Sequence, residues 1–218
     1  MTVTERDAAG SPRATLVAEQ RDLARERILR AARGALAERG LATTVDEVAE
    51  AAGVSRRTVF RHFDTRENLF AQALRESLRS YGDRVGPSVG GTVPADGDLT
   101  EWWRSVLVTV HEANARNGRV YWELSALEPE LTGELAAAAA ERREARKRFA
   151  GLMTRKVWEA RGGAGRPPTW LTDAVAVQLS GFTTQSLAGD FDRTPAQVAD
   201  VAARVLAAAF TDALADGG

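Results

Sequence analysis

The sequence contains no cysteine and only two histidines among its 218 residues. Without cysteine the chain can form neither a disulfide nor a thiolate metal site, which agrees with a reducing compartment. It has no stretch of roughly 18 uninterrupted apolar residues that would span a membrane, and its start lacks the apolar core of a signal peptide. We therefore expect a soluble cytoplasmic protein with no membrane partner, no metal and no cofactor.

Catalytic motifs are scarce as well. The sequence has no glycine-rich phosphate loop and no cluster of metal-ligating residues. His62 lies in a basic segment, so His111, followed by Glu112, is the remaining candidate for a general base. A single histidine on an ordinary helix is more often structural, so we expect that the chain is not an enzyme.

The overall charge selects no partner, because 29 basic and 30 acidic side chains leave a net charge of −1. Residues 53–63, GVSRRTVFRHF, differ: four of their side chains are arginine or histidine and none is acidic. An isolated run of arginines is usually a solvated helix face. A compact cationic cluster on a neutral chain nevertheless suggests a defined anionic partner.

The periodicity of apolar residues predicts an all-α fold, because they recur at three and four positions and strand-like alternation is absent. The first clear helix runs from about Leu23 to Glu38 and stops at Gly40. We place the next at Thr44, since Thr44 and Glu47 have the spacing of a capping box, and end it at Gly53.

Ser55 is placed to cap a third helix, in which Val59 and Phe63 must face inward together. Two helices joined by a three-residue connection that contains glycine predict a helix-turn-helix. A fourth helix begins near Thr65 and ends in the Gly/Pro-rich stretch 86–98. Later helices are expected at about 99–117, 119–127, 130–160, 169–189 and 195–215.

The N-terminal end of a helix carries partial positive charge and free amide protons, which favour phosphate. Arginines beside it add forks that fit guanine edges or phosphate oxygens. Because the basic cluster coincides with correctly spaced caps and a helix pair, we favour nucleic-acid binding over a solvated face.

The stretch TTVDEVAEAAGVSRRTVFRHFDTRENLF resembles the DNA-binding signature of the TetR family of bacterial transcriptional regulators. The resemblance covers about residues 24–74. It implies an N-terminal three-helix DNA-binding domain and a C-terminal helical bundle for ligand binding and dimerisation. The expected division is a disordered extension at 1–20, a helix-turn-helix domain at 21–66, and an effector-binding and dimerisation domain at 67–218. A minor-groove arm is the alternative for residues 1–20.

The resemblance also assigns roles in DNA binding. Thr44 would contact a phosphate, Arg56, Arg57 and Thr58 would face base edges, and Phe60 would pack on the sugar–phosphate wall. His62 and Arg66 would contact phosphates. The complete DNA-binding set is Thr44, Ser55, Arg56, Arg57, Thr58, Phe60, Arg61, His62 and Arg66. The paired arginines predict at least one guanine in each operator half-site.

All five tryptophans follow the Gly/Pro-rich stretch. For each aromatic residue, core packing is the plainer interpretation. Their crowding in helices that line the pocket of similar proteins favours an apolar or aromatic effector, with candidate contacts at Trp102, Trp103, His111, Tyr121, Trp122, Phe182 and Gln185. The run ERREARKRF at 141–149 is interpreted as an exposed helix face, because its Glu144 and Arg148 have the spacing of an ion pair.

The last helix has a broad stripe of small apolar residues, and residues 169–189 are apolar on nearly all sides. This pattern predicts a two-fold homodimer. Its interface is expected at Val177, Gly181, Thr184, Val198, Val201, Val205, Leu206 and Ala209.

The sequence is thus best interpreted as a homodimeric, sequence-specific repressor. Its ligands would be a pseudo-palindromic double-stranded DNA operator and a small effector that releases it. The alternatives are a transcriptional activator, an architectural DNA-binding protein without an effector and, less favoured, a small-molecule enzyme.

Overall fold

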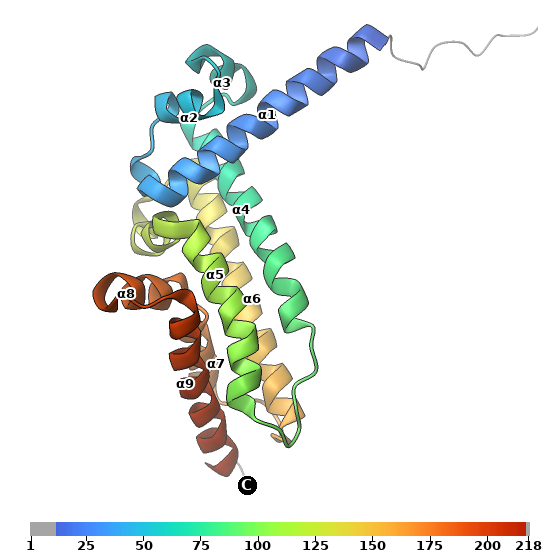
Figure 1. Cartoon of the computed structure of the whole chain (residues 1–218), viewed down its shortest axis with the longest axis vertical. Helices are drawn as coiled ribbons and strands as arrows, with labels where there is room; N and C mark the ends of the chain where they lie inside the picture. The colour runs from blue at the N-terminus through green and yellow to red at the C-terminus, as the bar shows by residue number, and fades with distance from the viewer. Residues whose placement is uncertain (1–11, 217–218) are drawn as a thin grey trace, which may run out of the picture.

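The computed structural model describes residues 12–216, and these form nine α-helices and two short 3-10 turns, as the predicted all-α class requires (Figure 1). The α-helices are α1 (Pro12–Arg39), α2 (Val45–Ala52), α3 (Arg56–His62), α4 (Arg66–Val89), α5 (Leu99–Ala126), α6 (Gly133–Ala160), α7 (Thr169–Gln178), α8 (Gly181–Phe191) and α9 (Pro195–Asp216). The 3-10 turns are η1 (Gly40–Ala42) and η2 (Glu128–Glu130).

Helix α1 begins earlier than the sequence pattern suggests. Residues 12–20 were expected to be disordered, but they form the first turns of α1. Pro12 suits the first position of a helix, and the alanine, leucine and glutamate residues that follow are good helix formers. Leu16 and Leu23 are exposed there, so this end of α1 projects from the body (Figure 1). The rest of the predicted extension, residues 1–11, lies outside the described part of the chain.

One hydrophobic core joins the N-terminal helices to the bundle. It contains Ile28 and Leu36 of α1, Val59 of α3 and Phe70 of α4, together with Leu124 from the far end of α5. The predicted domain boundary at residue 66 coincides with the start of α4. The apolar packing continues across that boundary, so α4 and α5 link the helix-turn-helix mechanically to the rest of the protein.

A second core fills the body of the bundle. Helix α9 packs along α5, and Trp103, with no exposed surface, meets Phe210 at a ring separation of 5.9 Å. Helices α4, α5 and α6 run along the long axis, with α7, α8 and α9 against α5 and α6 (Figure 1).

Three predicted helix boundaries change in the structure. Helix α4 continues through the glycine and proline at 86–87 to Val89, with Pro87 in its last turn. Residues 169–189 divide at Ser180, whose side chain caps α8 by accepting a hydrogen bond from the Thr183 amide.

The predicted break at Asn117-Gly118 is a kink within α5. Gly118 has φ 51° and ψ −140°, a conformation that needs glycine. A Cβ there would collide with the Ala37 carbonyl oxygen, so glycine also permits close contact between α5 and α1.

Candidate nucleic-acid interface

The helix-turn-helix is assembled by local signals that the sequence contains. The Glu47 amide donates to the Thr44 hydroxyl at 3.3 Å, and the Thr44 amide donates to the Glu47 carboxylate at 2.9 Å, which completes the predicted capping box. Gly53 ends α2 with φ 62°. Ser55 then accepts a hydrogen bond from the Thr58 amide at 3.1 Å, and α3 begins. The prediction of a helix-turn-helix is therefore confirmed.

The two sides of α3 differ in chemistry. Val59 and Phe63 are each 1% exposed and fasten α3 to the core, as predicted. Arg57 and Arg61 are exposed, and Phe60 is 37% exposed on the same short helix. An outward face with two cations and an aromatic ring, next to a capped N-terminus, suits a phosphate backbone and the edges of bases.

Arg56 is held in place within the chain. Its guanidinium forms an ion pair with Asp46 of α2 at 2.7 Å and lies 5.4 Å from the Phe60 ring centroid. Both members of the ion pair are more than half exposed, so the pair contributes little stability and can exchange partners. Arg57 and Arg61 have no ion pair within the described chain, so both are available to a new partner.

Arg66, predicted to contact a phosphate, forms hydrogen bonds within the chain. Its Nε donates to the Thr43 carbonyl at 3.2 Å, and its Nη2 donates to the Leu41 carbonyl at 2.5 Å. Its guanidinium also lies 4.5 Å from the Phe70 ring centroid. In the chain without DNA this side chain ties the loop before α2 to the start of α4, and its phosphate contact stays a prediction.

His62 is unsuited to the predicted phosphate contact. Both ring nitrogens are shielded from solvent and have no hydrogen-bond partner within residues 12–216. Burial, assisted by the nearby charges of Arg61, Arg21 and Arg25, lowers the pKa of His62. The ring is therefore neutral at pH 7 and belongs to the packing of α3 rather than to its charged face.

The hydroxyl groups of the predicted set act first as caps. Thr44 and Ser55 are exposed, and the Ser55 and Thr58 hydroxyls lie 2.9 Å apart. A hydroxyl that accepts from a backbone amide keeps its own proton for donation. Thr44 and Ser55 can thus hold the helix ends and still donate to phosphate.

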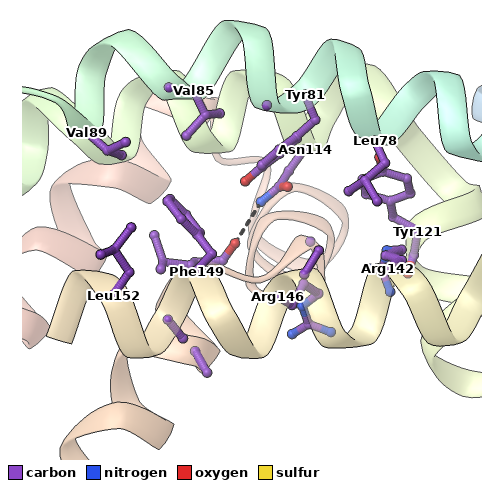
Figure 2. A pocket seen from close by; sticks show the side chains of 17 residues that line it. Leu78, Tyr81, Val85, Val89, Asn114, Tyr121, Arg142, Arg146, Phe149 and Leu152 are labelled. Carbon is purple, nitrogen blue, oxygen red and sulfur yellow. Dashed lines mark hydrogen bonds between the residues drawn. The ribbon is translucent and has the colours of Figure 1, made fainter. Parts of the chain in front are cut away.

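A cavity of about 350 Å³ lies between α4, α5 and α6 in the bundle. Figure 2 shows its two ends: Tyr121 and Arg142 lie together at one, while Val89 and Leu152 lie at the other. Asn114 lies between the two ends, and Phe149 lies on the side of Val89 and Leu152. Asn114 donates to the Leu179 carbonyl at 3.2 Å, which is the dashed line in Figure 2.

Most residues predicted to contact an effector do not line this cavity. Of the predicted set only Tyr121 does so. Trp103 belongs to the core, while Trp122 and Phe182 are exposed at 43% and 62%. Trp102 packs edge-on against Trp103 at 5.0 Å, and His111 is buried against the Thr184 hydroxyl at 2.8 Å. Gln185 is partly exposed on α8 and does not line the cavity.

Two cationic residues that were not predicted to contact an effector, Arg142 and Arg146, also line the cavity. They lie in the run 141–149 that was interpreted as an exposed face. The face is only partly exposed: Glu141 and Glu144 point outward, while Arg142 is 7% exposed. Both arginines are four residues apart, a spacing that puts them on one side of a helix and was the available signal.

Half of the predicted dimer interface lies inside the chain's own fold. Val198 and Leu206 are fully buried and Thr184 is 2% exposed, while Gly181 is also buried. These four positions are corrected to core residues, because the same apolar stripe that suggested a partner copy packs against α5. Ala209 is half-buried, whereas Val177, Val201 and Val205 are exposed at 53%, 46% and 43%.

Two kinds of site are absent from the described part of the chain, residues 12–216. No group of three or more histidine, aspartate or glutamate side chains there is arranged to hold a metal ion. No helix of that part is both long and apolar enough to cross a membrane.

Comparison with known proteins identifies the N-terminal part of the chain. Residues 28–73 match the family described as "Bacterial regulatory proteins, tetR family". An uncharacterised HTH-type transcriptional regulator of Mycobacterium tuberculosis is 31% identical over 123 residues, which are 56% of this chain and 58% of that protein. The chain thus spans little more than half the length of this curated relative.

Solved structures agree at the level of the fold. A TetR-family transcriptional regulator from Streptomyces coelicolor superposes with a TM-score of 0.66 at 18% identity, over 89% of this chain and 83% of that one. The multidrug binding protein EbrR, solved with imidazole, gives 0.54 at 22% identity, over 93% and 97%. At these identities the likeness shows the fold alone.

The helix-turn-helix and the family match define residues 28–73 as a DNA-binding domain of the TetR type. The family match itself is confined to this N-terminal segment. The matched family and the named relative are both described as transcriptional regulators.

Proposed function

We propose that this chain is a homodimeric, sequence-specific transcriptional repressor, acting on cytoplasmic DNA and released by a small molecule bound in the α4–α5–α6 cavity. The observation that carries the proposal is the outward face of α3, where Arg57 and Arg61 project from a scaffold fixed by Val59 and Phe63. In a dimer, two such helices would enter successive major grooves of a pseudo-palindromic operator.

Exposed apolar side chains on α7, α8 and α9 support the dimer. Val177, Phe182, Phe191, Val201 and Val205 are all more than 40% exposed. A cluster of large apolar side chains on the surface typically marks a protein–protein interface. The proposed interface keeps the exposed members of the predicted set and adds the two phenylalanines.

Helix α4 supports the coupling between effector and DNA. At its start Arg66 holds the carbonyls of Leu41 and Thr43, and near its end Tyr81 and Val85 line the cavity. A ligand that displaces the cavity end of α4 would therefore also move Arg66 at its start, and with it the loop that precedes α2. Useful induction needs preferential binding to the DNA-incompetent arrangement by about 1–3 kcal/mol.

A second link runs through α5 and supports the same coupling. Glu123 is 5% exposed, accepts a hydrogen bond from the Leu41 amide at 2.5 Å, and pairs with Arg119. Two residues earlier, Tyr121 lines the cavity. The loop 40–43 is thus gripped by α4 and α5, and both helices reach the proposed effector.

The test is selection from a randomised duplex library at physiological salt, followed by sequencing of the retained DNA. The repressor proposal expects one enriched inverted repeat. Arg57→Ala should weaken binding to it by about 1–3 kcal/mol and flatten the preference at one base position. Arg148→Ala, an exposed change on α6, is the matched control and should leave the motif unchanged.

Each other outcome points elsewhere. DNA retained without any motif would favour the architectural alternative, and equal weakening on all sequences would assign Arg57 to phosphate contact. No retention at all would refute the proposal. If one repeat is enriched, reporter expression from a promoter that carries it would distinguish repression from activation.

A further inference from the structure

The cavity contains a positive charge that no acidic group in the described chain neutralises. Arg142 is 7% exposed and donates only to neutral acceptors, the Tyr121 carbonyl at 3.0 Å and the Ser125 hydroxyl at 3.2 Å. The acids beside it on α6 are engaged elsewhere, Glu141 with Arg75 and Glu144 with Lys147. A buried cation without a counter-charge is costly and therefore uncommon.

The groups around Arg142 increase the positive character of this end of the cavity. Its charged neighbour is a second arginine, Arg146, and the phenols of Tyr81 and Tyr121 are close by. Burial lowers the pKa of Arg142 to about 10, so that the side chain stays protonated at pH 7. Burial raises the pKa of Tyr121 to about 12, which keeps its phenol neutral and able to donate.

Two buried donors at this end have no partner. The Nε of Arg142 and the hydroxyl of Tyr121 are shielded from solvent and form no hydrogen bond with residues 12–216. The Arg142 guanidinium lies 4.6 Å from the Tyr121 ring centroid, so both donors belong to the same site. An anion placed here would receive a charge-assisted hydrogen bond and a phenolic one.

The opposite end of the cavity is apolar. Val85, Val89, Phe149 and Leu152 surround it, and Figure 2 shows them away from Tyr121 and Arg142. The volume of the whole cavity, about 350 Å³, is at the lower end of the range for small-molecule sites, which is roughly 300–1,000 Å³. The site therefore suits a small molecule whose two ends differ in polarity.

We propose that the cavity binds an anionic amphiphile, a small molecule whose single carboxylate pairs with Arg142 and Tyr121 and whose apolar body extends toward Val89 and Leu152. This proposal rests on the proposed function, because it takes the cavity as the effector site. It narrows the apolar or aromatic effector expected from the sequence to molecules that carry a negative charge.

The experiment is calorimetric titration of the full chain, without DNA, with octanoate and 2-naphthoate and with their neutral counterparts octan-1-ol and 2-naphthol. At least one carboxylate should bind about 10–100-fold more tightly than its alcohol, the range expected for a hydrogen bond to a charged group. Equal affinities, or no binding by either carboxylate, would overturn the proposal.

Variants locate the binding to the cavity. Arg142→Met should remove the preference for carboxylate, while Arg148→Met, on the exposed side of the same helix, should retain it. Tyr121→Phe should weaken the carboxylate several-fold. Arg142→Lys keeps the charge and should retain part of the preference, so it decides the question if the methionine variant does not fold. An unchanged preference in all three cavity variants would contradict the assignment.

The two proposals fail separately. Equal binding of carboxylate and alcohol would leave the operator selection untouched, and an absent operator motif would leave the carboxylate preference measurable. A second selection, with the binding carboxylate added to the duplex library, tests whether carboxylate binding controls DNA binding. Release of the enriched repeat would show that the anion is an inducer rather than a bystander.

Discussion

His111 should make the stability of this protein depend on pH between 5 and 7. The residue has no exposed surface, its Nδ1 lies 2.8 Å from the Thr184 hydroxyl, and its Nε2 has no partner in the described chain. Burial lowers the pKa of His111 from 6.5 to about 4. The folded protein therefore holds the neutral imidazole throughout the range in which the unfolded chain takes up a proton.

The sign and size of the effect follow from that difference. Below pH 6.5 the unfolded state binds a proton that the folded state does not, so the free energy of unfolding falls with falling pH until the folded pKa is reached. Between pH 7.5 and pH 5 the loss comes to about 2 kcal/mol for pKa values of 6.5 and 4. The full stabilisation is present above pH 6.5.

Urea denaturation followed by circular dichroism at pH 7.5, 6.5, 5.5 and 5 measures this dependence. The measurements stop at pH 5 so that Glu141 stays ionised in all of them and does not add to the slope. The hydrogen bond from Arg75 lowers the pKa of Glu141. His111→Asn preserves a donor toward Thr184 and removes the titrating ring. It should therefore remove most of the slope.

His62 requires a control, since burial and neighbouring arginines lower its pKa too, in the same direction. His62→Asn separates the two contributions. If His111→Asn unfolded with the same pH slope as the wild-type chain, the ring would be charged or hydrated in the folded state, and the reasoning from its burial would be wrong.

Three further expectations concern the backbone, the link between helices and the dimer. Gly118→Ala should lower the free energy of unfolding by about 1–3 kcal/mol, because its backbone conformation would be strained and its Cβ would collide with α1. Gly34→Ala is the control: its Cβ meets no atom within 4 Å, so the free energy of unfolding should rise by about 0.5–1 kcal/mol in the same urea assay. Glu123→Ala leaves the Leu41 amide without its acceptor and should cost about 1–3 kcal/mol, against less than about 0.5 kcal/mol for the exposed Glu112→Ala; equal effects would argue against the link. Val205→Glu should convert a dimer to a monomer at micromolar concentration in analytical ultracentrifugation, and a monomeric wild-type chain would refute the proposed interface.

Much of the N-terminal architecture was predictable because it depends on neighbours in the chain. The capping box of Thr44 and Glu47, the stop at Gly53 and the cap at Ser55 each involve residues within three or four positions. The inward pair Val59 and Phe63 follows from helical spacing alone. These signals define the helix pair without any knowledge of what packs behind it.

The dependence on neighbours has a limit at the ends of helices. Residues 12–20 show no apolar period, yet they continue α1, because propensity and a first-turn proline suffice to extend a helix that is already anchored by packing. A lack of amphipathic pattern indicates exposure, and exposure is not disorder.

The roles of the charged side chains were decided by the tertiary structure. By composition, Arg56, Arg57, Arg66 and Arg142 are equivalent cations. In the structure Arg57 faces outward, Arg56 pairs with Asp46, Arg66 holds backbone carbonyls, and Arg142 is enclosed in a cavity without an acid. Each role depends on a partner or an enclosure supplied by another helix, which no local pattern specifies.

The sequence by itself therefore determined the helical class, the helix-turn-helix and the family resemblance of its N-terminal segment, because each rests on spacing along the chain. The tertiary structure alone decided which aromatic residues fill the core, which apolar stripe is covered by α5, and where an uncompensated positive charge is buried. The physical reason is that burial and charge pairing arise between segments distant in sequence, and their energies depend on what each segment encloses.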